Sequence, residues 1–453
     1  MLIVQTPVLA LRPYARNART HSRQQIRQIA KSIEKFGFLA PVLVDDQNQI
    51  LAGHGRVEAA KLLGMATVPT VQFSHLNEAD KRAFILADNR LAELAGWDRE
   101  LLVVELQGLI DLGFEVELTG FETPEIDLLI EEVSESKADP GPEDDIPELS
   151  AGPPVTRPKD LWILGAHRLL CGDAREDASY VQLLGAARAD VVFTDPPYNV
   201  PVRGHVSGRG RVQHREFAMA AGEMTEVEFT AFLKRTLGHA TSFSRDGAVH
   251  FICCDWRHVG EFLAAGRELY GELLNICIWA KTNFGLGALY RSQHEFVLVY
   301  RVGTAAHLNN VEHRPQGRNR SNLWRYAGVN TFRAGRLEEL AMHPTVKPVA
   351  LIADAIRDVS RRNDIVLDPF CGSGSTIVAA EKTGRHAYAL EIDPAYVDAS
   401  VRRWEKFTGK VAIHTETGMS FEETAEARLT KVDASAISEM PKIPSPLVEE
   451  SRP

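Results

Sequence analysis

The sequence predicts an α/β fold, in which helices flank a mostly parallel sheet, together with a small N-terminal α+β domain. Two apolar runs predict the sheet: residues 191–193 lead into the string DPPY, and residues 365–367 lead into DPFCGSGST. Runs that are apolar throughout are typical of parallel strands buried on both faces. The third observation is the order helix, two short strands, helix and strand within residues 1–95, which predicts the smaller domain.

Length and composition indicate a globular protein of several domains. The chain has 453 residues, of which 44% are hydrophobic and 25% charged, as is ordinary for globular proteins of roughly two or three domains. Five cysteines lack CxxC spacing, so we interpret them as reduced packing residues. No apolar run approaches the roughly 20 residues of a membrane span, and the first basic residues follow the apolar stretch, opposite to a secretory signal. We therefore expect a cytoplasmic protein with no membrane partner and no metal.

Composition divides the chain into five segments. A polar segment rich in Glu, Asp, Ser, Gly and Pro cannot bury enough apolar surface to order itself, which predicts a linker. A long α/β pattern follows it, and a polar end predicts a weakly ordered tail. The expected boundaries are 1–95 for the small N-terminal domain, 96–133 for a helical extension, 134–158 for the acidic linker, 159–414 for the main domain and 415–453 for the tail.

The first helix of the N-terminal domain is predicted at both ends. Ser22 and Gln25 fit a capping box that opens the helix, and apolar residues at helical spacing continue as far as Gly37. Two short strands around a polar turn, a glycine loop, a second helix and a strand come next. This order resembles the ParB N-terminal or sulfiredoxin-like fold.

The loop after the two short strands consists of Gly53, His54, Gly55 and Arg56. In the family that this region resembles, the loop carries a Gly-, acid- and Arg-rich string, and the helix that follows receives nucleotide phosphates. Here the loop has one Arg and no acidic residue. Three interpretations stay open: a turn of glycines with a solvated Arg, a docking or DNA contact, and nucleotide binding.

The string DPFCGSGST predicts a loop that holds a nucleotide-like ligand. A buried strand opens at Asp368, and Gly372 and Gly374 let the backbone approach a ligand closely. The next strand ends at Glu391, about 20 residues after the glycines, where a carboxylate can accept hydrogen bonds from both ribose hydroxyls.

Two ligands compete for this loop, a dinucleotide and S-adenosyl-L-methionine, and a plain structural turn is the third alternative. The dinucleotide fingerprint requires a third glycine, but Ile377 occupies that position. A carboxylate at Asp368 would repel a pyrophosphate, whereas it suits the amino group of S-adenosyl-L-methionine, which carries no phosphate. We therefore expect S-adenosyl-L-methionine as the cofactor.

A second signal for the same ligand is the segment HPTVKP just before a helix. Thr345 can cap that helix with Pro348 in its first turn, so that free amides and Lys347 point toward a carboxylate. The methionine end of the expected cofactor supplies such a carboxylate. By itself the segment indicates only the start of a helix.

The string DPPY predicts a site for an exocyclic amine. Prolines fix φ and remove backbone donors, so Asp195 and the carbonyl of Pro196 are rigid acceptors beside the ring of Tyr198. Accepting both amine hydrogens exposes the nitrogen lone pair to the methyl group of the donor. The ring would stack on the base, worth roughly 1–3 kcal/mol, and a base inside a duplex must first be flipped out.

Together the two strings resemble those of the amino-methyltransferases of DNA, in the permuted arrangement where the catalytic string precedes the donor string. The resemblance implies a Rossmann-like methyltransferase domain acting on double-stranded DNA. An Asp at the first position of DPPY favours adenine N6 over cytosine N4 in that family. The residues it implies as catalytic are Asp195, Pro196, Pro197 and Tyr198, and those it implies as cofactor-binding are Asp173, Thr345, Lys347, Asp368, Phe370, Gly372, Gly374 and Glu391.

The net charge of −10 conceals a basic stretch that suits a DNA partner. Residues 131–148 carry eight acidic groups and one Lys, whereas residues 301–336 carry seven Arg and one Glu. Association with phosphates depends on the local field. We interpret two Arg- and Gly-rich segments as DNA contacts, with a lid over the active site as the alternative. The expected contacts are Arg209, Arg211, Arg318, Arg320 and Arg325.

The overall prediction is a site-specific DNA methyltransferase that uses S-adenosyl-L-methionine. Cytosine N4 is the nearest alternative to adenine N6. A different class stays open as well: a nucleotide-gated, ParB-like DNA-binding adaptor whose methyltransferase half is not catalytic. A homodimer is a further candidate assembly.

Overall fold

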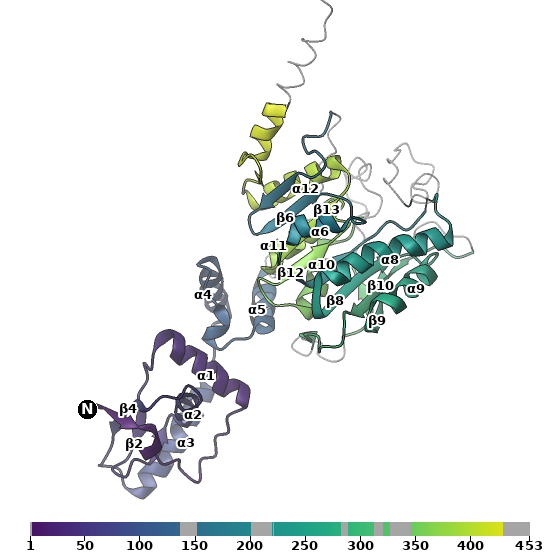
Figure 1. Ribbon diagram of the computed structural model, residues 1–453. Helices are drawn as coiled ribbons and strands as arrows, with labels where there is room; N and C mark the ends of the chain where they lie inside the picture. Colours follow the sequence, from purple (N-terminus) through teal and green to yellow (C-terminus); the bar gives the residue numbers. More distant parts are fainter. Residues whose placement is uncertain are drawn as a thin grey trace, which may run out of the picture. The chain divides into compact units, whose positions relative to one another are not determined.

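The protein is described by a computed structural model over residues 2–135, 152–200, 220, 222–281, 289–311, 320–326 and 346–428. It divides into two compact units, Met1–Ala138 and Asp139–Pro453, and each is described by itself (Figure 1). Four residues with predicted roles lie outside the described ranges: Arg209, Arg211, Arg318 and Thr345.

The first unit contains a four-stranded sheet in the order β1-β4-β2-β3. Its first helix begins as predicted, because the Ser22 hydroxyl accepts a hydrogen bond from the amide of Gln25, and it ends at Gly37 with φ +83°. The first strand was not predicted, and it pairs antiparallel with the last. The elements are β1 (Ile3–Pro7), η1 (Val8–Ala10), α1 (Arg23–Phe36), β2 (Val42–Val44), β3 (Ile50–Ala52), α2 (His54–Leu62), β4 (Thr67–Gln72) and α3 (Glu78–Leu94).

A small helical group follows in the same unit. Its elements pack around an apolar cluster that contains Leu106, Val116 and Ile126. Asp98 caps the first of its helices by accepting from the amide of Leu101. The elements are α4 (Arg99–Asp111), η2 (Val116–Thr119) and α5 (Thr123–Glu135).

The second unit is built on a ten-stranded sheet in the order β11-β9-β10-β8-β7-β12-β13-β6-β5-β14. Its central strands, from β8 to β6, run parallel to one another, which confirms the predicted fold class. One antiparallel strand, β10, lies between β8 and β9. The strands are β5 (Leu161–Leu164), β6 (His167–Cys171), β7 (Ala189–Thr194), β8 (Ser244–Cys254), β9 (Glu272–Ala280), β10 (His294–Arg301), β11 (Leu323–Arg325), β12 (Ile365–Asp368), β13 (His386–Glu391) and β14 (Ile413–His414).

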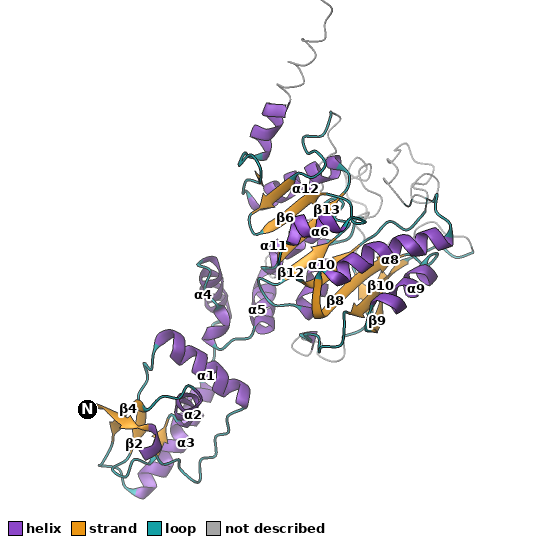
Figure 2. Ribbon diagram, in the orientation of Figure 1, coloured by secondary structure: helices purple, strands orange, loops and turns teal. Residues whose placement is uncertain are grey.

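Helices cover both faces of this sheet (Figure 2). Because successive side chains of a strand point to opposite faces, Val192 packs with α6 on one face, while Val191 and Phe193 pack with α10 on the other. The helices on the first face are α6 (Asp177–Leu184), α8 (Glu226–Ser242) and α9 (Val259–Leu269). Those on the second face are α10 (Val349–Val359), α11 (Ser375–Thr383) and α12 (Pro394–Thr408).

The strand order agrees with the permutation that the sequence predicts. Strands β12 and β13 come late in the chain, yet they lie between β7 and β6, which come early. Val366 of β12 is paired with Val191 of β7 in parallel register. The strand that leads into DPPY and the strand that leads into DPFCGSGST are therefore direct neighbours.

Two expected boundaries need correction. The expected linker included residues 152–158, but the amides of Val155 and Thr156 donate to Asp398 of α12, so this end belongs to the second unit. The expected tail included residues 415–428, but Phe421 is buried in the core of that unit, and Arg428 donates to Asp160. No helix within the described ranges is long and apolar enough to span a membrane.

Candidate functional site

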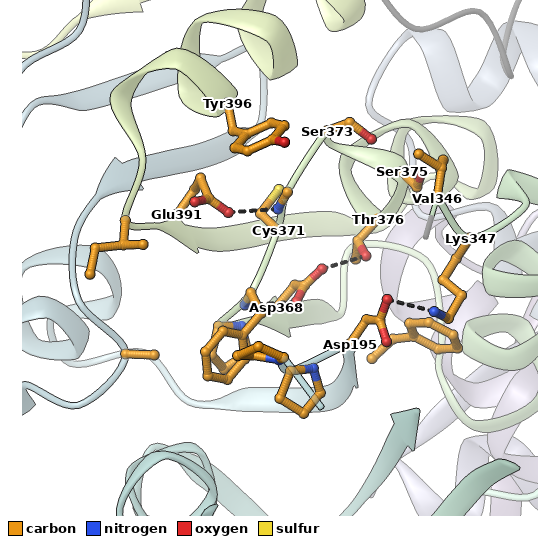
Figure 3. Close-up of a pocket in the computed structure, with 18 of the residues that line it drawn as sticks. Asp195, Val346, Lys347, Asp368, Cys371, Ser373, Ser375, Thr376, Glu391 and Tyr396 are labelled. Carbon is orange, nitrogen blue, oxygen red and sulfur yellow. Dashed lines mark hydrogen bonds and ion pairs between the residues drawn. The ribbon is translucent and has the colours of Figure 1, made fainter. Parts of the chain in front are cut away.

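The site forms where β7 and β12 end side by side. The Thr194 hydroxyl, at the end of β7, donates to Asp368 Oδ1, at the end of β12, at 3.0 Å. The turn after β7 (residues 195–198, the DPPY turn) and the loop after β12 (residues 368–376, the Gly-rich loop) therefore border one cleft (Figure 3). Its empty volume is about 1100 Å³, open mouth included.

Asp368 is the buried acid at the centre of the Gly-rich loop. Its Oδ1 accepts from Thr194 and from the amide of Phe370 at 3.0 Å each, and its Oδ2 accepts from the Thr376 hydroxyl at 2.6 Å. Burial nevertheless raises the pKa of Asp368 to about 6. A cationic group in the cleft would offset this cost of desolvation. Phe370 also lines the cleft.

Glu391 ends β13, the next strand along the sheet. Its two oxygens accept from the amide of Gly372 at 2.8 Å and from the amide of Asp393 at 2.9 Å. Burial raises the pKa of Glu391 to about 7. A carboxylate has about four lone-pair sites, so each oxygen can accept one more hydrogen bond. Figure 3 shows Glu391 and Asp195 on opposite sides of Asp368.

Helix α12 supports the Gly-rich loop from beneath. The Ser400 hydroxyl donates to the carbonyl of Gly372 at 2.8 Å, and Arg403 donates to the carbonyl of Ser373 at 3.0 Å. Gly374 adopts φ +82°, and a Cβ there would lie 3.0 Å from Ser400 Oγ. This close approach explains why a glycine occupies the position.

On the other side of the cleft, the Asp195 carboxylate is held at both oxygens. Its Oδ1 accepts from the Tyr198 hydroxyl, and its Oδ2 accepts from Lys347 Nζ at 2.5 Å. Burial raises the pKa of Asp195, and Lys347 opposes that shift. Pro196 and Pro197 line the cleft together with Asp195 and Tyr198, so the structure brings all four predicted catalytic residues together.

Lys347 lines the cleft and contacts two carboxylates of the protein. Its ammonium lies near Asp195 and also 2.9 Å from Glu295 Oε2, because a side chain that is only 4% exposed needs anionic partners within the protein. Its contact with the carboxylate of the cofactor stays a prediction. Sequence reasoning missed Glu295. A single acid in the otherwise apolar run of β10, HEFVLVY, was the available signal.

Two other predicted residues are already engaged by neighbours. Arg175 donates to both carboxylate oxygens of Asp173, and the neighbours of Asp173, Gly172 and Ala174, line the cleft. Arg320 donates to Asp358 of α10, and its side chain is 15% exposed. Arg325 by contrast is exposed, on β11.

The loop of residues 53–56 in the first unit is also packed. Gly53 begins α2 with φ +102°. Arg56 donates to the carbonyl of Ala40 at 2.9 Å, and His54 Nε2 accepts from the amide of Tyr14 at 3.2 Å. Burial lowers the pKa of His54. Gly55 is buried between His21 and Ile29. The functions proposed for this loop stay predictions.

Family comparisons agree with this geometry. Residues 189–402 match the DNA methylase family, residues 3–90 match the ParB N-terminal domain, and residues 100–158 match the ParB-methyltransferase HTH domain. The chain therefore contains a DNA methylase domain of the N6/N4 type and a ParB-like N-terminal domain. The helix-turn-helix match covers the segment that the sequence indicated only as a helical extension and a linker.

Individual relatives cover different parts of the chain. The ParB-like nuclease domain-containing protein YnaK of Escherichia coli is 49% identical over 80 residues, 18% of this chain and 92% of that protein. The Type II methyltransferase M.HinfI of Haemophilus influenzae is 26% identical over 233 residues, 47% of this chain and 62% of that protein. A putative DNA modification methylase of Thermus thermophilus, solved with S-adenosyl-L-methionine, is 23% identical and covers 56% of this chain and 96% of its own, with a TM-score of 0.38.

Proposed function

We propose that the protein transfers the methyl group of S-adenosyl-L-methionine to the exocyclic N6 of an adenine that is flipped out of double-stranded DNA. The observation that carries the proposal is the hydrogen bond between Thr194 and Asp368, which joins the ends of two neighbouring strands. It means that a donor on the Gly-rich loop and an amine on the DPPY turn share one cleft. Holding two reactants at contact distance can supply roughly 7–11 kcal/mol of the barrier.

The chemistry of the Gly-rich loop suits this donor. Asp368 is a buried acid that a cation would stabilise, and the donor carries an ammonium. Glu391 has acceptor capacity left for ribose hydroxyls. Gly372 lines the cleft, and Gly374 supports it because its missing Cβ lets the loop pack closely on Ser400 of α12. These side chains bind and orient the donor, which supplies the methyl group.

The DPPY turn suits the acceptor. Asp195 and the carbonyl of Pro196 would accept hydrogen bonds from the two N–H groups of the amine and so expose its nitrogen lone pair to the methyl group of the donor. The bound donor would supply that methyl group and leave as the thioether, and the surplus proton of the methylated nitrogen would pass to solvent. The Tyr198 ring packs against the base by stacking. Adenine is proposed because Asp, rather than Ser, occupies the first position of this turn.

The test is a nucleoside analysis of unmethylated duplex DNA after incubation with the protein and the donor. We expect N6-methyldeoxyadenosine with the natural protein and none with Asp195→Ala, which should still bind the donor by calorimetry because Asp195 acts on the acceptor. If N4-methyldeoxycytidine forms instead, the target is the cytosine amine and the adenine proposal is wrong. No methylated nucleoside and no donor binding would favour the DNA-binding adaptor.

A further inference from the structure

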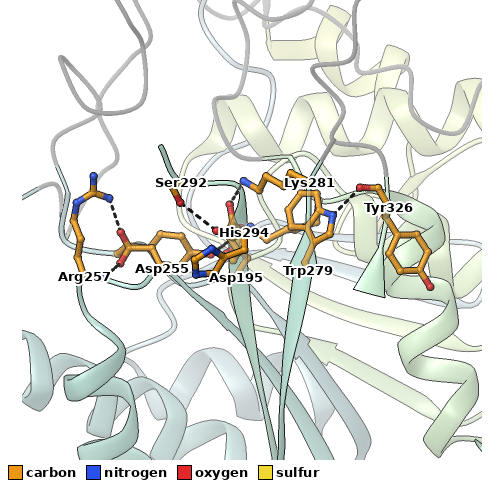
Figure 4. A network of polar contacts seen from close by, with 11 residues as sticks. Asp195, Asp255, Arg257, Trp279, Lys281, Ser292, His294 and Tyr326 are labelled. Atoms are coloured by element: carbon orange, nitrogen blue, oxygen red, sulfur yellow. Dashed lines mark hydrogen bonds and ion pairs between the residues drawn. The ribbon is translucent and has the colours of Figure 1, made fainter. Parts of the chain in front are cut away.

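Four charged side chains of alternating sign form a continuous chain behind the DPPY turn. Asp195 contacts Lys347 at 2.5 Å, Lys347 contacts Glu295 at 2.9 Å, and Glu295 contacts Lys281. Figure 4 shows Asp195 and Lys281 in this network beside Trp279, over whose ring Lys281 Nζ lies at 4.6 Å. We call these four residues the charge chain.

The two middle members of the charge chain are buried, and its two end members are partly exposed. The side chains of Lys347 and Glu295 are 4% and 9% exposed, whereas those of Asp195 and Lys281 are 20% and 29% exposed. Two buried charges are stable only if each has close partners of opposite sign. Lys347 therefore depends on both Asp195 and Glu295, and Glu295 depends on both lysines.

The four residues of the charge chain meet because β10 runs opposite to its neighbours in the sheet. In a parallel sheet the acidic ends of β7 and β12 meet at one edge, and only an antiparallel strand can bring its first residues to that edge. Glu295 is the second residue of β10 and is paired with Trp279 near the end of β9. Lys281 follows β9 directly. The sheet topology thus fixes Glu295 and Lys281 beside Asp195.

We propose that Glu295 and Lys281 are positioning residues for the methyl transfer, which act through Lys347 to hold the Asp195 carboxylate toward the target amine. This inference rests on the function proposed above. Glu295 shares the Lys347 ammonium with Asp195, so Asp195 keeps acceptor capacity for an incoming N–H instead of being saturated by a full ion pair. Lys281 in turn fixes Glu295 and sets how much of the Lys347 charge remains for Asp195.

The groups that face Asp195 determine the direction of each expected effect. A negative neighbour raises the pKa of Asp195 and a positive neighbour lowers it. Removing the charge of Glu295 should therefore lower the pKa of Asp195, and removing that of Lys281 should raise it. The other facing groups are unchanged in both variants, and they are Tyr198, Cys253, Cys254, Lys347 and Asp368.

The experiment measures kcat against pH at saturating donor and DNA for Glu295→Gln and Lys281→Gln. Asp195 must be ionised to accept a hydrogen bond from the target amine. We therefore expect kcat to fall on the acidic side of the pH profile, as Asp195 becomes protonated. We expect this acidic limb to move down in pH for Glu295→Gln and up for Lys281→Gln, each by roughly one pH unit. At the optimum, kcat of Glu295→Gln should fall roughly 10- to 100-fold, with donor affinity unchanged.

Glu381→Gln is the matched control. Glu381 also contacts a lysine, Lys410, at 2.9 Å and is 20% exposed, but it does not line the cleft. This variant should lose stability and keep both kcat and the acidic limb. If Glu295→Gln does not fold, the half-exposed Lys281 still provides the test.

Three results would overturn the inference. The first is an acidic limb that stays in place for both variants, and the second is a shift of both in the same direction. The third is a loss in Glu295→Gln that appears only in melting temperature. Failure of the proposed function is a separate outcome, since the natural protein itself would then produce no methylated nucleoside.

Discussion

The Thr194 hydroxyl donates to Asp368 Oδ1 across 174 positions of the chain, and both side chains are almost completely buried. This contact couples the end of β7, which leads into the DPPY turn, to the end of β12, which leads into the Gly-rich loop. The acceptor and donor sides of the cleft therefore share one rigid boundary. Changes on either side can be separated by whether they affect turnover or donor binding.

Asp368→Asn should weaken donor binding at least roughly tenfold, because it removes the charge that faces the ammonium. Thr194→Val is its matched partner: it removes one hydrogen bond and keeps the carboxylate, so it should weaken binding less. Calorimetry gives both affinities, and kcat at saturating donor should change less than the affinity does in Asp368→Asn. Equal affinities for the two variants would contradict this role.

Donor affinity should fall as the pH drops below about 7, because burial raises the pKa of Glu391 to about 7 and only the ionised form offers both oxygens to the ribose. The fall should approach tenfold per pH unit well below that pKa. Calorimetry between pH 6 and 8.5 measures it. Glu391→Gln should bind weakly across this range without the same dependence, and a pH dependence that survives the substitution would assign it to another group.

Without donor, the same shift acts on stability in the opposite direction. The pKa of Glu391 is raised from 4.5 in the unfolded chain to about 7 in the folded one, so between these values the folded state binds more protons. The free energy of unfolding should therefore rise as the pH falls from about 7 toward 4.5. Denaturation in urea, compared with Glu391→Gln, measures this contribution. Addition of donor should reduce it.

Gly374→Ala should abolish tight donor binding, because a Cβ would lie 3.0 Å from Ser400 Oγ and force the loop away from α12. Gly409→Ala is a close control: it has a similar left-handed φ of +70° with nothing within 4 Å of the added carbon. Both variants should lose about 1–2 kcal/mol of stability from backbone strain. Only Gly374→Ala should lose donor affinity, and an equal loss in both would point to stability alone.

Arg325→Gln should reduce the salt dependence of DNA binding, because one phosphate contact fewer lowers the slope by about one. Arg320→Gln should leave the slope unchanged and instead lower the melting temperature, since its guanidinium is bound to Asp358. Filter binding across a salt series measures the slope. A reduced slope for Arg320→Gln would support the prediction from the sequence that Arg320 contacts DNA.

The sequence could predict the meeting of the two strand ends, but not everything that lies around them. Fully apolar runs followed by DPPY and by a Gly-rich loop define buried parallel strands, and such strands open at a common edge. Asp195, Asp368 and Glu391 follow from that pattern. Their burial and hydrogen-bond partners do not, because these depend on packing between segments far apart in the chain.

Glu295 and Ser400 show why the remainder of the site was missed. Glu295 reaches Lys347 because β10 runs antiparallel, and the alternation of side chains along a strand does not specify its direction. Ser400 lies in the middle of α12, where its spacing is that of any small helical residue. The contact that gives it a role, to the carbonyl of Gly372, depends on how α12 packs on the sheet.

The late position of β12 and β13 in the chain also determines when the second unit can fold during synthesis. The sheet of the second unit has no centre until the chain has been synthesised past Glu391, because these two strands separate β6 from β7. Domains generally fold as units during synthesis, so the ParB-like unit can be complete while the methylase half still exposes unpaired strands. A protein truncated before β12 would therefore lack the central strands and leave β6 and β7 with unpaired edges, a condition that favours aggregation.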